Sequence, residues 1–393
     1  MHGESYSRVG HTLVRHVSSH FARLVQSCFP AAIVWGALMG SPRDASAAQT
    51  IASAAADGAR LYQDNCVACH GSDGRGNAQA VVGFDVALPD FTDCLFATVE
   101  GAEGWEAVVR EGGPVRALDR HMPAFGGALS EDEIRLVVGH VRRFCTSRGW
   151  PQGDLNLPRA LVTEKAYPEN EALFTMSISR EPTRSVGNNF IYERRFGARN
   201  QYEVNVPFDA QRSEAGVWLH GLGDIAVAVK RAFYHDVERG SIVSLGEEVS
   251  LPTGKQSESL GKGFTVFESF VAAGQRLPRE SFVQFQGGLE IPTEAARASK
   301  EAFWRTAIGK TITQSTRRWT PMVEIVGARE LESGARSEWD VVPQMQITVS
   351  KRQHIMLSAG LQVPLNGRDE RASQFLTYFL WDWYEGGLLD GWR

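Results

Sequence analysis

The feature that most constrains this chain is the pentapeptide Cys66-Val67-Ala68-Cys69-His70. Two cysteines separated by two residues and followed at once by histidine form the attachment motif of a c-type haem. The two thiols would become thioethers to the vinyl groups of the haem, and the imidazole would lie beneath the iron as its proximal ligand. A structural zinc site would require a second cysteine pair at similar spacing, and the sequence contains none. The motif therefore predicts one covalently attached haem c.

Residues 1–48 have the layout of an export signal. Three arginines precede an apolar run over residues 29–40, and small residues follow at 45–48, the spacing of a cleavage site. The apolar run is too short to span a bilayer. Export agrees with the pentapeptide motif, because c-type haem is attached outside the cytoplasm. We expect the mature chain to begin near residue 48 or 49.

The composition limits the classes of protein that need to be considered. A length of 393 residues suggests two domains, and a hydrophobic content of 43% with 22% charged residues describes a folded chain. The net charge of −5 leaves no basic footprint, so we expect no nucleic-acid partner. Beyond the N-terminus no window of about twenty apolar residues occurs. The absence of such a window excludes only proteins that cross a membrane with helices.

Residues 49–150 are predicted to form a small helical domain around the haem motif. One helix should run from Asp57 to Cys66, and a second should cover Gly104 to Glu111. The sequence from Ser130 to Glu133 has the form of a capping box, in which the side chain of each of these two residues accepts a hydrogen bond from the backbone N–H of the other. The helix that follows places four apolar side chains on one face, at the spacing i, i+3, i+4, i+7: Ile134, Val137, Val138 and Val141.

The iron needs a sixth ligand or an open coordination site. Met122, in the sequence His121-Met122-Pro123-Ala124-Phe125-Gly126, is the candidate for the ligand. A thioether sulfur is a soft donor that suits haem iron, and ligation by histidine and methionine raises the reduction potential. The proline and glycine favour a loop that can present the sulfur to the iron. His121 is the alternative ligand.

With these features, residues 49–150 resemble a class I cytochrome c. In that family a proline carbonyl accepts the N–H of the proximal histidine and orients its ring. The resemblance implies this role for Pro89, in the sequence Leu88-Pro89-Asp90-Phe91. It also implies iron ligated by His70 and Met122, with no open position for oxygen or peroxide. We therefore expect electron transfer and no enzymatic activity.

Two cysteines remain outside the haem motif and the export signal. Cys94 and Cys145 form an even pair in what should be an oxidising compartment, which favours a disulfide between them. The general class I pattern does not include these two cysteines, so the resemblance does not support the bridge. Two buried thiols are the alternative.

Residues 151–170 are predicted to be a linker. Pro151, Pro158 and Pro168 punctuate a stretch without a sustained period. Each proline removes a backbone donor and disfavours helix at the residue before it. We expect a semi-extended segment that could be ordered by docking.

In residues 171–393 the hydrophobic period changes from 3.6 to 2, which indicates β-strands. About twelve strands of 10 to 14 residues are predicted, beginning near Ala172, Asn188, Asn200, Leu222, Ser241, Gly263, Glu280, Glu301, Trp319, Trp339, His354 and Ala372. Short connections alternate with longer polar ones, of which residues 209–221 are the first. An even strand count with this alternation is typical of an outer-membrane barrel. We therefore predict an all-β antiparallel barrel of about 12 strands after the all-α domain. The alternative is a soluble β-sandwich or lipid-binding barrel.

This half resembles the exported barrel family typified by the MetA-type protein of phenol-degradation operons. The resemblance rests on Gly221-Leu222-Gly223-Asp224-Ile225 and Leu251-Pro252-Thr253-Gly254, and it implies the fold alone. One departure concerns the C-terminus, because outer-membrane barrels commonly end in phenylalanine whereas this chain ends Asp390-Gly391-Trp392-Arg393.

Together the two halves predict a monohaem cytochrome of a Gram-negative outer membrane, with the cytochrome domain docked or tethered on the periplasmic side. The architecture resembles the fused cytochrome–porins of iron-oxidising bacteria. Its partners would be redox proteins or an external electron donor. Two alternatives remain. The first is a channel or uptake barrel whose cytochrome is a docking or sensing module. The second is a periplasmic cytochrome with a soluble β-domain.

Overall fold

The computed structural model describes residues 45–179, 184–213, 215–314, 317–369 and 371–383. The predicted export signal up to residue 44 and the C-terminal residues around Trp392 lie outside the described residues. The chain divides into two units, and the second begins at Ala55. The second unit holds most of the helical domain and the whole of the sheet. Among the described residues, no helix is both long enough and apolar enough to cross a membrane.

The helical domain is built from one long and several short helices. Helix α8 begins with the predicted capping box, since the Ser130 side chain accepts from the Glu133 N–H while the Glu133 carboxylate accepts from the Ser130 N–H. The predicted apolar face of α8 is buried against Leu61 and Tyr62 of α3. The helices are α3 (Ala45–Asn65), α4 (Val67–His70), α5 (Gln79–Val82), α6 (Cys94–Ala97), α7 (Ala102–Glu111) and α8 (Glu131–Val141), with the 3₁₀ turn η1 (Gly113–Arg116).

Helices α3 and α8 approach closely because a glycine lies where they meet. A Cβ atom at Gly58 would lie 2.3 Å from the carbonyl oxygen of Leu136. No side chain fits that separation, so the two helix backbones can pack only with glycine at this position.

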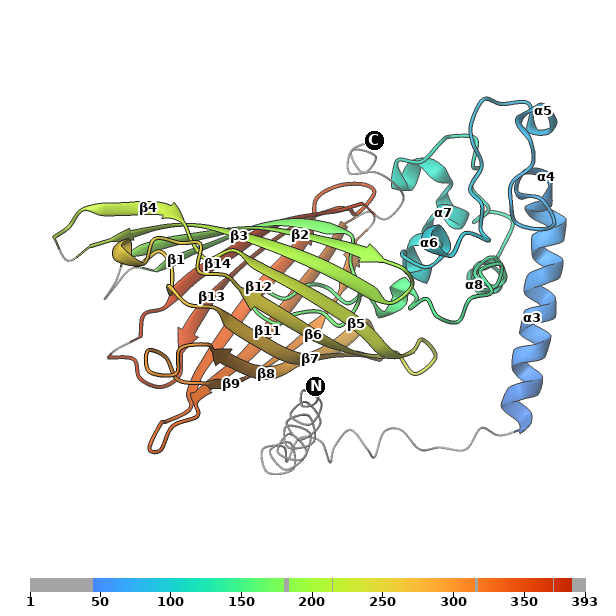
Figure 1. Ribbon diagram of the computed structural model, residues 1–393. Helices are drawn as coiled ribbons and strands as arrows, with labels where there is room; N and C mark the ends of the chain where they lie inside the picture. The colour runs from blue at the N-terminus through green and yellow to red at the C-terminus, as the bar shows by residue number, and fades with distance from the viewer. Residues whose placement is uncertain (1–44, 180–183, 214, 315–316, 370, 384–393) are drawn as a thin grey trace, which may run out of the picture. The chain divides into compact units, whose positions relative to one another are not determined.

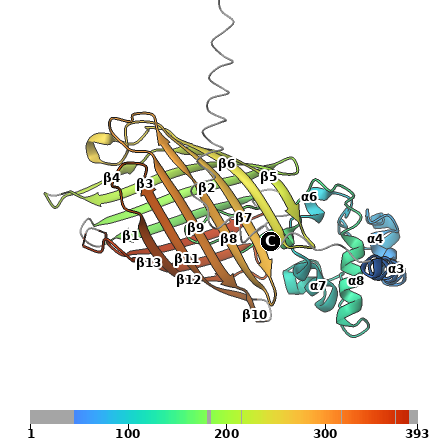
Figure 2. The same ribbon diagram turned by 90° about the horizontal axis from the view of Figure 1, so that it is seen from below.

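Residues 171–382 form a closed antiparallel barrel of twelve strands (Figures 1 and 2). Strand β9 pairs with β11 and closes the ring, so the predicted twelve-strand barrel is confirmed. The strands of the ring are β1 (Glu171–Ser179), β2 (Ser185–Phe196), β3 (Asn200–Arg212), β5 (Ala226–Asp236), β6 (Ser241–Ser250), β7 (Val266–Leu277), β8 (Ser281–Pro292), β9 (Glu301–Lys310), β11 (Arg317–Glu330), β12 (Glu338–Thr348), β13 (Ile355–Pro364) and β14 (Gln374–Asp382).

Two further strands are short extensions of the ring. Strand β10 (Ile312–Gln314) pairs with β11, and β4 (Trp218–Leu222) pairs with β3. The second pairing corrects the prediction that residues 209–221 form a long loop. Strand β3 continues to Arg212, and the alternating side chains of β4 pair with it as a hairpin extension.

The strands expose large apolar side chains on the outside of the barrel, and they bury many polar side chains together with apolar ones inside it. On β12, Asp340, Gln344 and Gln346 are buried, whereas Met345 between them is exposed. The alternation of buried and exposed residues agrees with the alternation in the sequence, and the exterior is apolar, whereas a soluble barrel has a polar exterior. Large apolar side chains exposed on the other strands include Phe174, Phe190, Val229, Leu245, Val271, Ile308, Val323, Leu361 and Phe375.

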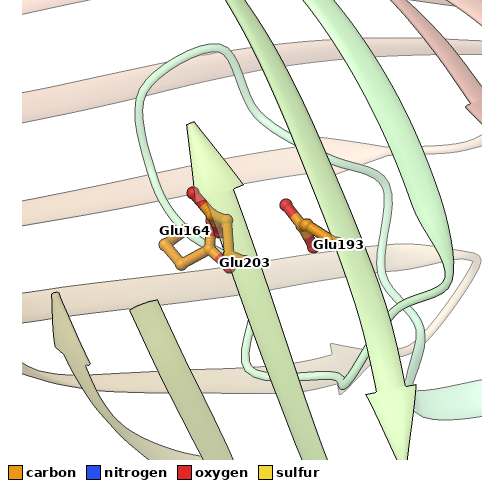
Figure 3. Close-up of side chains that lie close together, drawn as sticks. All are labelled: Glu164, Glu193 and Glu203. Atoms are coloured by element: carbon orange, nitrogen blue, oxygen red, sulfur yellow. The ribbon is translucent and has the colours of Figure 1, made fainter. Parts of the chain in front are cut away.

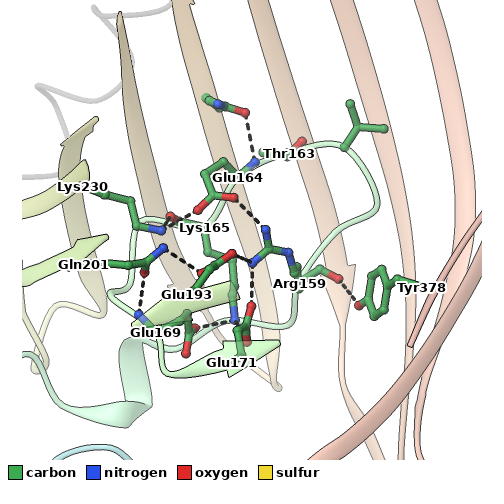
Figure 4. Close-up of polar contacts among 12 residues, drawn as sticks. Arg159, Thr163, Glu164, Lys165, Glu169, Glu171, Glu193, Gln201, Lys230 and Tyr378 are labelled. Carbon is green, nitrogen blue, oxygen red and sulfur yellow. Dashed lines mark hydrogen bonds and ion pairs between the residues drawn. The ribbon is translucent and has the colours of Figure 1, made fainter. Parts of the chain in front are cut away.

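The lumen contains part of the chain itself. Residues 156–169, here called the lumen segment, follow the 3₁₀ turn η2 (Gly153–Leu155) and lead into β1. Tyr378 of β14 donates a hydrogen bond to the Arg159 carbonyl oxygen at 2.7 Å, and Gln284 of β8 donates to the Pro158 carbonyl oxygen at 2.8 Å. Figure 4 shows the segment surrounded by strands. Residues 156–169 are therefore held by contacts within the barrel. That residues 151–170 act as a linker stays a prediction.

The helical domain contacts the rim of the barrel that carries the tight turns. Arg318, at the start of β11, donates to the carboxylate of Glu103 on α7 at 3.0 Å. Arg199, in the turn between β2 and β3, donates to the carbonyl oxygen of Gly149 at 2.9 Å. Because Glu171 pairs with Asp382, the first and last strands of the ring also meet at this rim.

Candidate haem-binding site

A cavity of about 540 Å³ opens in the helical domain beside the pentapeptide motif. Cys66, Cys69 and His70 line it from one side and Met122 lines it from the loop before α8. These residues come from separate parts of the sequence, and the fold brings them together around one space. The apolar part of the lining includes Leu88, Pro89, Phe91, Phe96, Trp105, Val109, Phe125 and Val137.

Hydrogen bonds from distant side chains hold the backbone of the motif. The Tyr62 hydroxyl donates to the carbonyl oxygen of Gly71 at 2.8 Å. The Asn77 side-chain amide donates to the carbonyl oxygens of Val67 and Ala68 at 2.9 and 3.0 Å. Gly71 itself has φ +72°, the left-handed region in which glycine is favoured. The chain therefore leaves α4 in a fixed direction immediately after the histidine.

The two motif cysteines are half-buried and are not disulfide-bonded. Burial and the neighbouring Cys69 raise the pKa of the Cys66 thiol to about 11. Cys94 and Cys145, by contrast, are joined by a disulfide with their Cα atoms 5.1 Å apart. The disulfide links α6 to the segment after α8 and leaves the motif thiols available for thioether bonds.

His70 has the environment of a metal-ligating histidine. Its burial lowers the pKa of the imidazole, which favours the neutral form that can donate a lone pair to iron. Its ring packs 4.9 Å from the ring of Phe91, and its Nδ1 is buried without a hydrogen-bond partner. Pro89 lines the same cavity, but the hydrogen bond from Nδ1 to its carbonyl that the family resemblance implies is not made in this structure. The role of Pro89 stays a prediction.

The loop that carries Met122 is held by the backbone of α7 and η1. The Gly113 N–H donates to the Met122 carbonyl oxygen at 3.0 Å, and the Phe125 N–H donates to the Val109 carbonyl oxygen at 2.9 Å. A Cβ atom at Gly113 would lie 2.1 Å from the Asp119 carbonyl oxygen, so only glycine permits this close approach. The loop thereby presents Met122 to the cavity.

His121 lies at the same cavity but is engaged by its neighbours. Its Nδ1 lies 2.6 Å from the Asp119 carboxylate, and its ring stacks on Phe84 with the centroids 4.5 Å apart. The contacts with His121 also hold the pKa of the Asp119 carboxyl below its usual value. These contacts fix the imidazole at the cavity wall, so Met122 is the better candidate for the second axial ligand.

Two polar groups at the cavity were not found from the sequence. Arg116 is 7% exposed, and its Nη1 is buried without a hydrogen-bond partner, as is Nε1 of Trp105. The pKa of Arg116 is lowered, mainly because the guanidinium is buried. Unpaired buried donors beside an apolar cavity fit a ligand with anionic groups, such as the propionates of haem. No local pattern around either residue signals such a role. The cavity, the free thiols and the unpartnered His70 together fit haem c.

A second cluster of ionisable groups lies inside the barrel. Carboxylate oxygens of Glu164, Glu193 and Glu203 lie within 4.8 Å of one another (Figure 3). Arg159 lies 2.7 Å from Glu193 and 3.0 Å from Glu164, and Lys230 also pairs with Glu164. Because cations of the chain already pair with two of the three carboxylates, we assign no metal ion to this cluster.

The fold and the cavity define a cytochrome c domain followed by a closed β-barrel of the outer-membrane type. Residues 53–141 match the family model described as cytochrome c oxidase, cbb3-type, subunit III.

Two curated relatives match this part of the chain. A cbb3-type oxidase subunit FixPc of Rhizobium leguminosarum bv. viciae is 32% identical over 110 residues, 28% of this chain and 31% of that one. A cbb3-type oxidase subunit CcoP of Cereibacter sphaeroides is 36% identical over 90 residues, 23% of this chain and 27% of that one. The chain thus spans about a third or less of the length of these relatives.

Two solved structures align with the barrel. An outer membrane channel from Pseudomonas putida F1 does so with a TM-score of 0.42 and 10% identity, over 58% of this chain and 100% of that one. The NanC porin does so with a TM-score of 0.39 and 8% identity, over 54% of this chain and 99% of that one. The barrel architecture itself rests on the strand pairing described above.

Proposed function

We propose that this protein is a monohaem c-type cytochrome that transfers single electrons at the outer membrane and periplasm. The observation that carries the proposal is that Cys66, Cys69, His70 and Met122 line one cavity. The two thiols would hold the haem covalently, and His70 and Met122 would be its axial ligands. When bound, the haem supplies a one-electron couple between ferric and ferrous iron.

The residues of the chain favour electron transfer over bond-forming chemistry. His70 offers a neutral imidazole because its burial lowers the pKa. Met122 offers a soft sulfur, which raises the reduction potential of a histidine-ligated iron. With both residues as ligands, the iron would keep no open position for oxygen or peroxide. The apolar walls, which include Phe91 and Trp105, exclude water and so favour the less charged reduced state.

The exterior of the barrel supports a location in the outer membrane. Its twelve ring strands have nine to fourteen residues, and about nine to eleven tilted residues suffice to cross a bilayer. Large apolar side chains are exposed on these strands, which water disfavours and lipid tolerates. We place the rim with tight turns in the periplasm, where short turns of such barrels lie. The cytochrome domain then lies on the periplasmic side.

A closed barrel also favours a second candidate, a channel or uptake function with the cytochrome as a docking or sensing module. The two candidates differ in whether the activity of the protein depends on the oxidation state of the haem. Ion conductance that is unaffected by the oxidation state of the iron would favour the channel. Reversible reduction of the iron by a protein partner would favour electron transfer.

Fractionation of the native membranes, followed by haem staining, tests the proposal. We expect one haem-stained band in the outer-membrane fraction, and loss of the stain in a Cys66→Ala, Cys69→Ala variant. Staining in the soluble periplasmic fraction alone would contradict the membrane location. Staining that persists in the double variant would contradict the attachment site.

A further inference from the structure

The haem cavity is lined by the barrel as well as by the helical domain. Arg352 and His354, which lie between β12 and β13, line it together with the cysteines, His70 and Met122. Residues 349–354 connect these two strands and are here called the rim turn. Both domains therefore contribute side chains to one cavity.

Hydrogen bonds fix the shape of the rim turn. The Ser350 hydroxyl oxygen accepts from the N–H groups of His354 and Ile355 at 3.0 and 3.1 Å. The Val349 N–H donates to the Ile355 carbonyl oxygen at 2.9 Å. The His354 carbonyl oxygen accepts from the N–H of Asp382 on β14, also at 2.9 Å. The turn is thus tied to two neighbouring strands and has a defined position on the barrel wall.

A buried polar contact joins the rim turn to the helical domain. Nε2 of His354 lies 3.5 Å from the carboxylate of Glu100, and the His354 side chain is 2% exposed. Burial raises the pKa of the Glu100 carboxyl, but the hydrogen bond and charge of His354, with the charges of Arg318 and Arg116, outweigh burial and hold that pKa below its usual value. The carboxylate is therefore ionised at neutral pH and holds the imidazole beside the cavity.

Further contacts hold α7 and the segment before it against the barrel. The Glu103 carboxylate accepts from Arg318 of β11 at 3.0 Å and from Thr313 of β10 at 3.1 Å. The Thr98 carbonyl oxygen accepts from the Tyr167 hydroxyl of the lumen segment at 3.2 Å. Because several elements of the barrel make these contacts, the rim turn and the rest of the cavity are held in one arrangement.

Two guanidinium groups line the cavity, one from each domain. Arg116 of η1 is buried and its Nη1 has no hydrogen-bond partner, and Arg352 is the half-buried member from the rim turn. A guanidinium binds a carboxylate through two parallel hydrogen bonds. Haem carries two carboxylate groups, its propionates. The two arginines therefore match these groups in number and in charge.

From these contacts we propose that the rim turn is part of the haem site: Arg352 binds a carboxylate group of the haem, and His354, held by Glu100, positions the turn at the cavity. The inference rests on the proposed function. An unpaired carboxylate beside the haem favours the more positive ferric iron, so its pairing with Arg352 raises the reduction potential. The barrel thereby tunes the electron carrier.

Redox titration of the purified full-length protein tests the role of Arg352. Lys351→Gln is the matched control for Arg352→Gln, because Lys351 is an exposed cation of the same turn and is not among the described residues that line the cavity. We expect Arg352→Gln to shift the reduction equilibrium about tenfold toward the ferric state, which is about 59 mV for one electron. Arg352→Lys, which keeps the charge, should restore most of the potential. Equal midpoints in Arg352→Gln and Lys351→Gln would overturn the proposal.

A vibrational measurement separates direct binding from a charge that acts at a distance. The bending vibrations of the haem carboxylates in the resonance Raman spectrum respond to the hydrogen bonds that these groups accept. We expect one of these bands to move in Arg352→Gln and to stay in place in Lys351→Gln. Carboxylate bands that are unchanged in Arg352→Gln would overturn the binding role.

A double-mutant cycle tests the positioning role of His354. His354→Gln removes the imidazole contact with Glu100. We expect Arg352→Gln to shift the midpoint clearly less in the His354→Gln background than in the wild type, because the turn is then no longer held at the cavity. Additive shifts would overturn the positioning role. If His354→Gln does not fold, Glu100→Gln breaks the same contact from the other side and completes the cycle.

The wild-type titration separates this inference from the proposed function. A wild-type protein without reducible haem would count against the proposed function, before any variant is compared. Reducible haem whose potential and carboxylate bands do not respond to Arg352→Gln would overturn only the role of the rim turn.

Discussion

The N–H of Gly113 donates a hydrogen bond to the carbonyl oxygen of Met122 at 3.0 Å. This bond ties the loop of the candidate axial ligand to the turn after α7. The position of the sulfur therefore depends on a glycine nine residues earlier in the sequence, and several predictions about the haem domain can be tested through such supporting residues.

Replacing Gly113 with alanine should displace the methionine loop. The added Cβ would meet the Asp119 carbonyl oxygen at 2.1 Å, and such overpacking typically costs about 1–3 kcal/mol. We expect weaker methionine ligation and a lower unfolding midpoint in urea, followed by haem absorbance. Gly127→Ala is the control, since nothing lies within 4 Å of its Cβ position. Equal losses in both variants would contradict this explanation.

Removing the disulfide should destabilise the haem domain without changing ligation. The bridge between Cys94 and Cys145 spans 51 residues, for which the loop-entropy model gives about 4 kcal/mol. We expect the double serine variant to unfold at a clearly lower urea concentration while its visible spectrum remains that of the wild type. A changed spectrum in the folded variant would show that the bridge also positions the haem.

The stability of the haem domain should fall at acid pH because the Glu133 carboxylate becomes protonated. The capping hydrogen bonds with Ser130 hold the pKa of Glu133 below its usual value of 4.5. Between the two pKa values the unfolded state therefore binds more protons than the folded state. The stabilising contribution of Glu133 is present above pH 4.5 and is lost as the pH falls through the lower pKa of the folded state. Glu133→Gln should show a smaller loss of stability between neutral and acid pH. An unchanged pH dependence would count against this carboxylate.

Replacing Arg116 with glutamine should lower the reduction potential. A positive charge beside the cavity favours the reduced iron, which carries one positive charge less. Arg116 is 7% exposed, so water screens this charge little. Arg110→Gln is the control, because Arg110 is paired with Glu131. Redox titration should give a lower midpoint for Arg116→Gln than for the control, and an unchanged or higher midpoint would refute the electrostatic role.

Much of this architecture could be predicted because its signals are local. The haem motif is contiguous, the capping box spans four residues, and strand alternation repeats at every second position. The twelve strands could be counted from that period alone. The hairpin extension of β3 by β4 was missed because polar residues 209–221 look like a loop until the pairing partner is known.

The lumen segment could not be predicted in the same way. Leu161 binds Glu324 across 163 positions of sequence, and no local period marks that contact. The prolines around the segment predict a semi-extended chain, but its surroundings are set by the closed ring. Arg116 and Trp105 were missed for a similar reason, since only the folded cavity reveals their unpaired donors.

The most direct test of the central claim is the visible and magnetic circular dichroism spectrum of the oxidised full-length protein and its Met122→Ala variant. Met345→Ala, on the exposed face of β12, is the control. We expect the sulfur-to-iron charge-transfer band in the wild type and the control, and its loss in Met122→Ala. A spectrum of histidine–methionine ligation that survives in Met122→Ala would contradict the account.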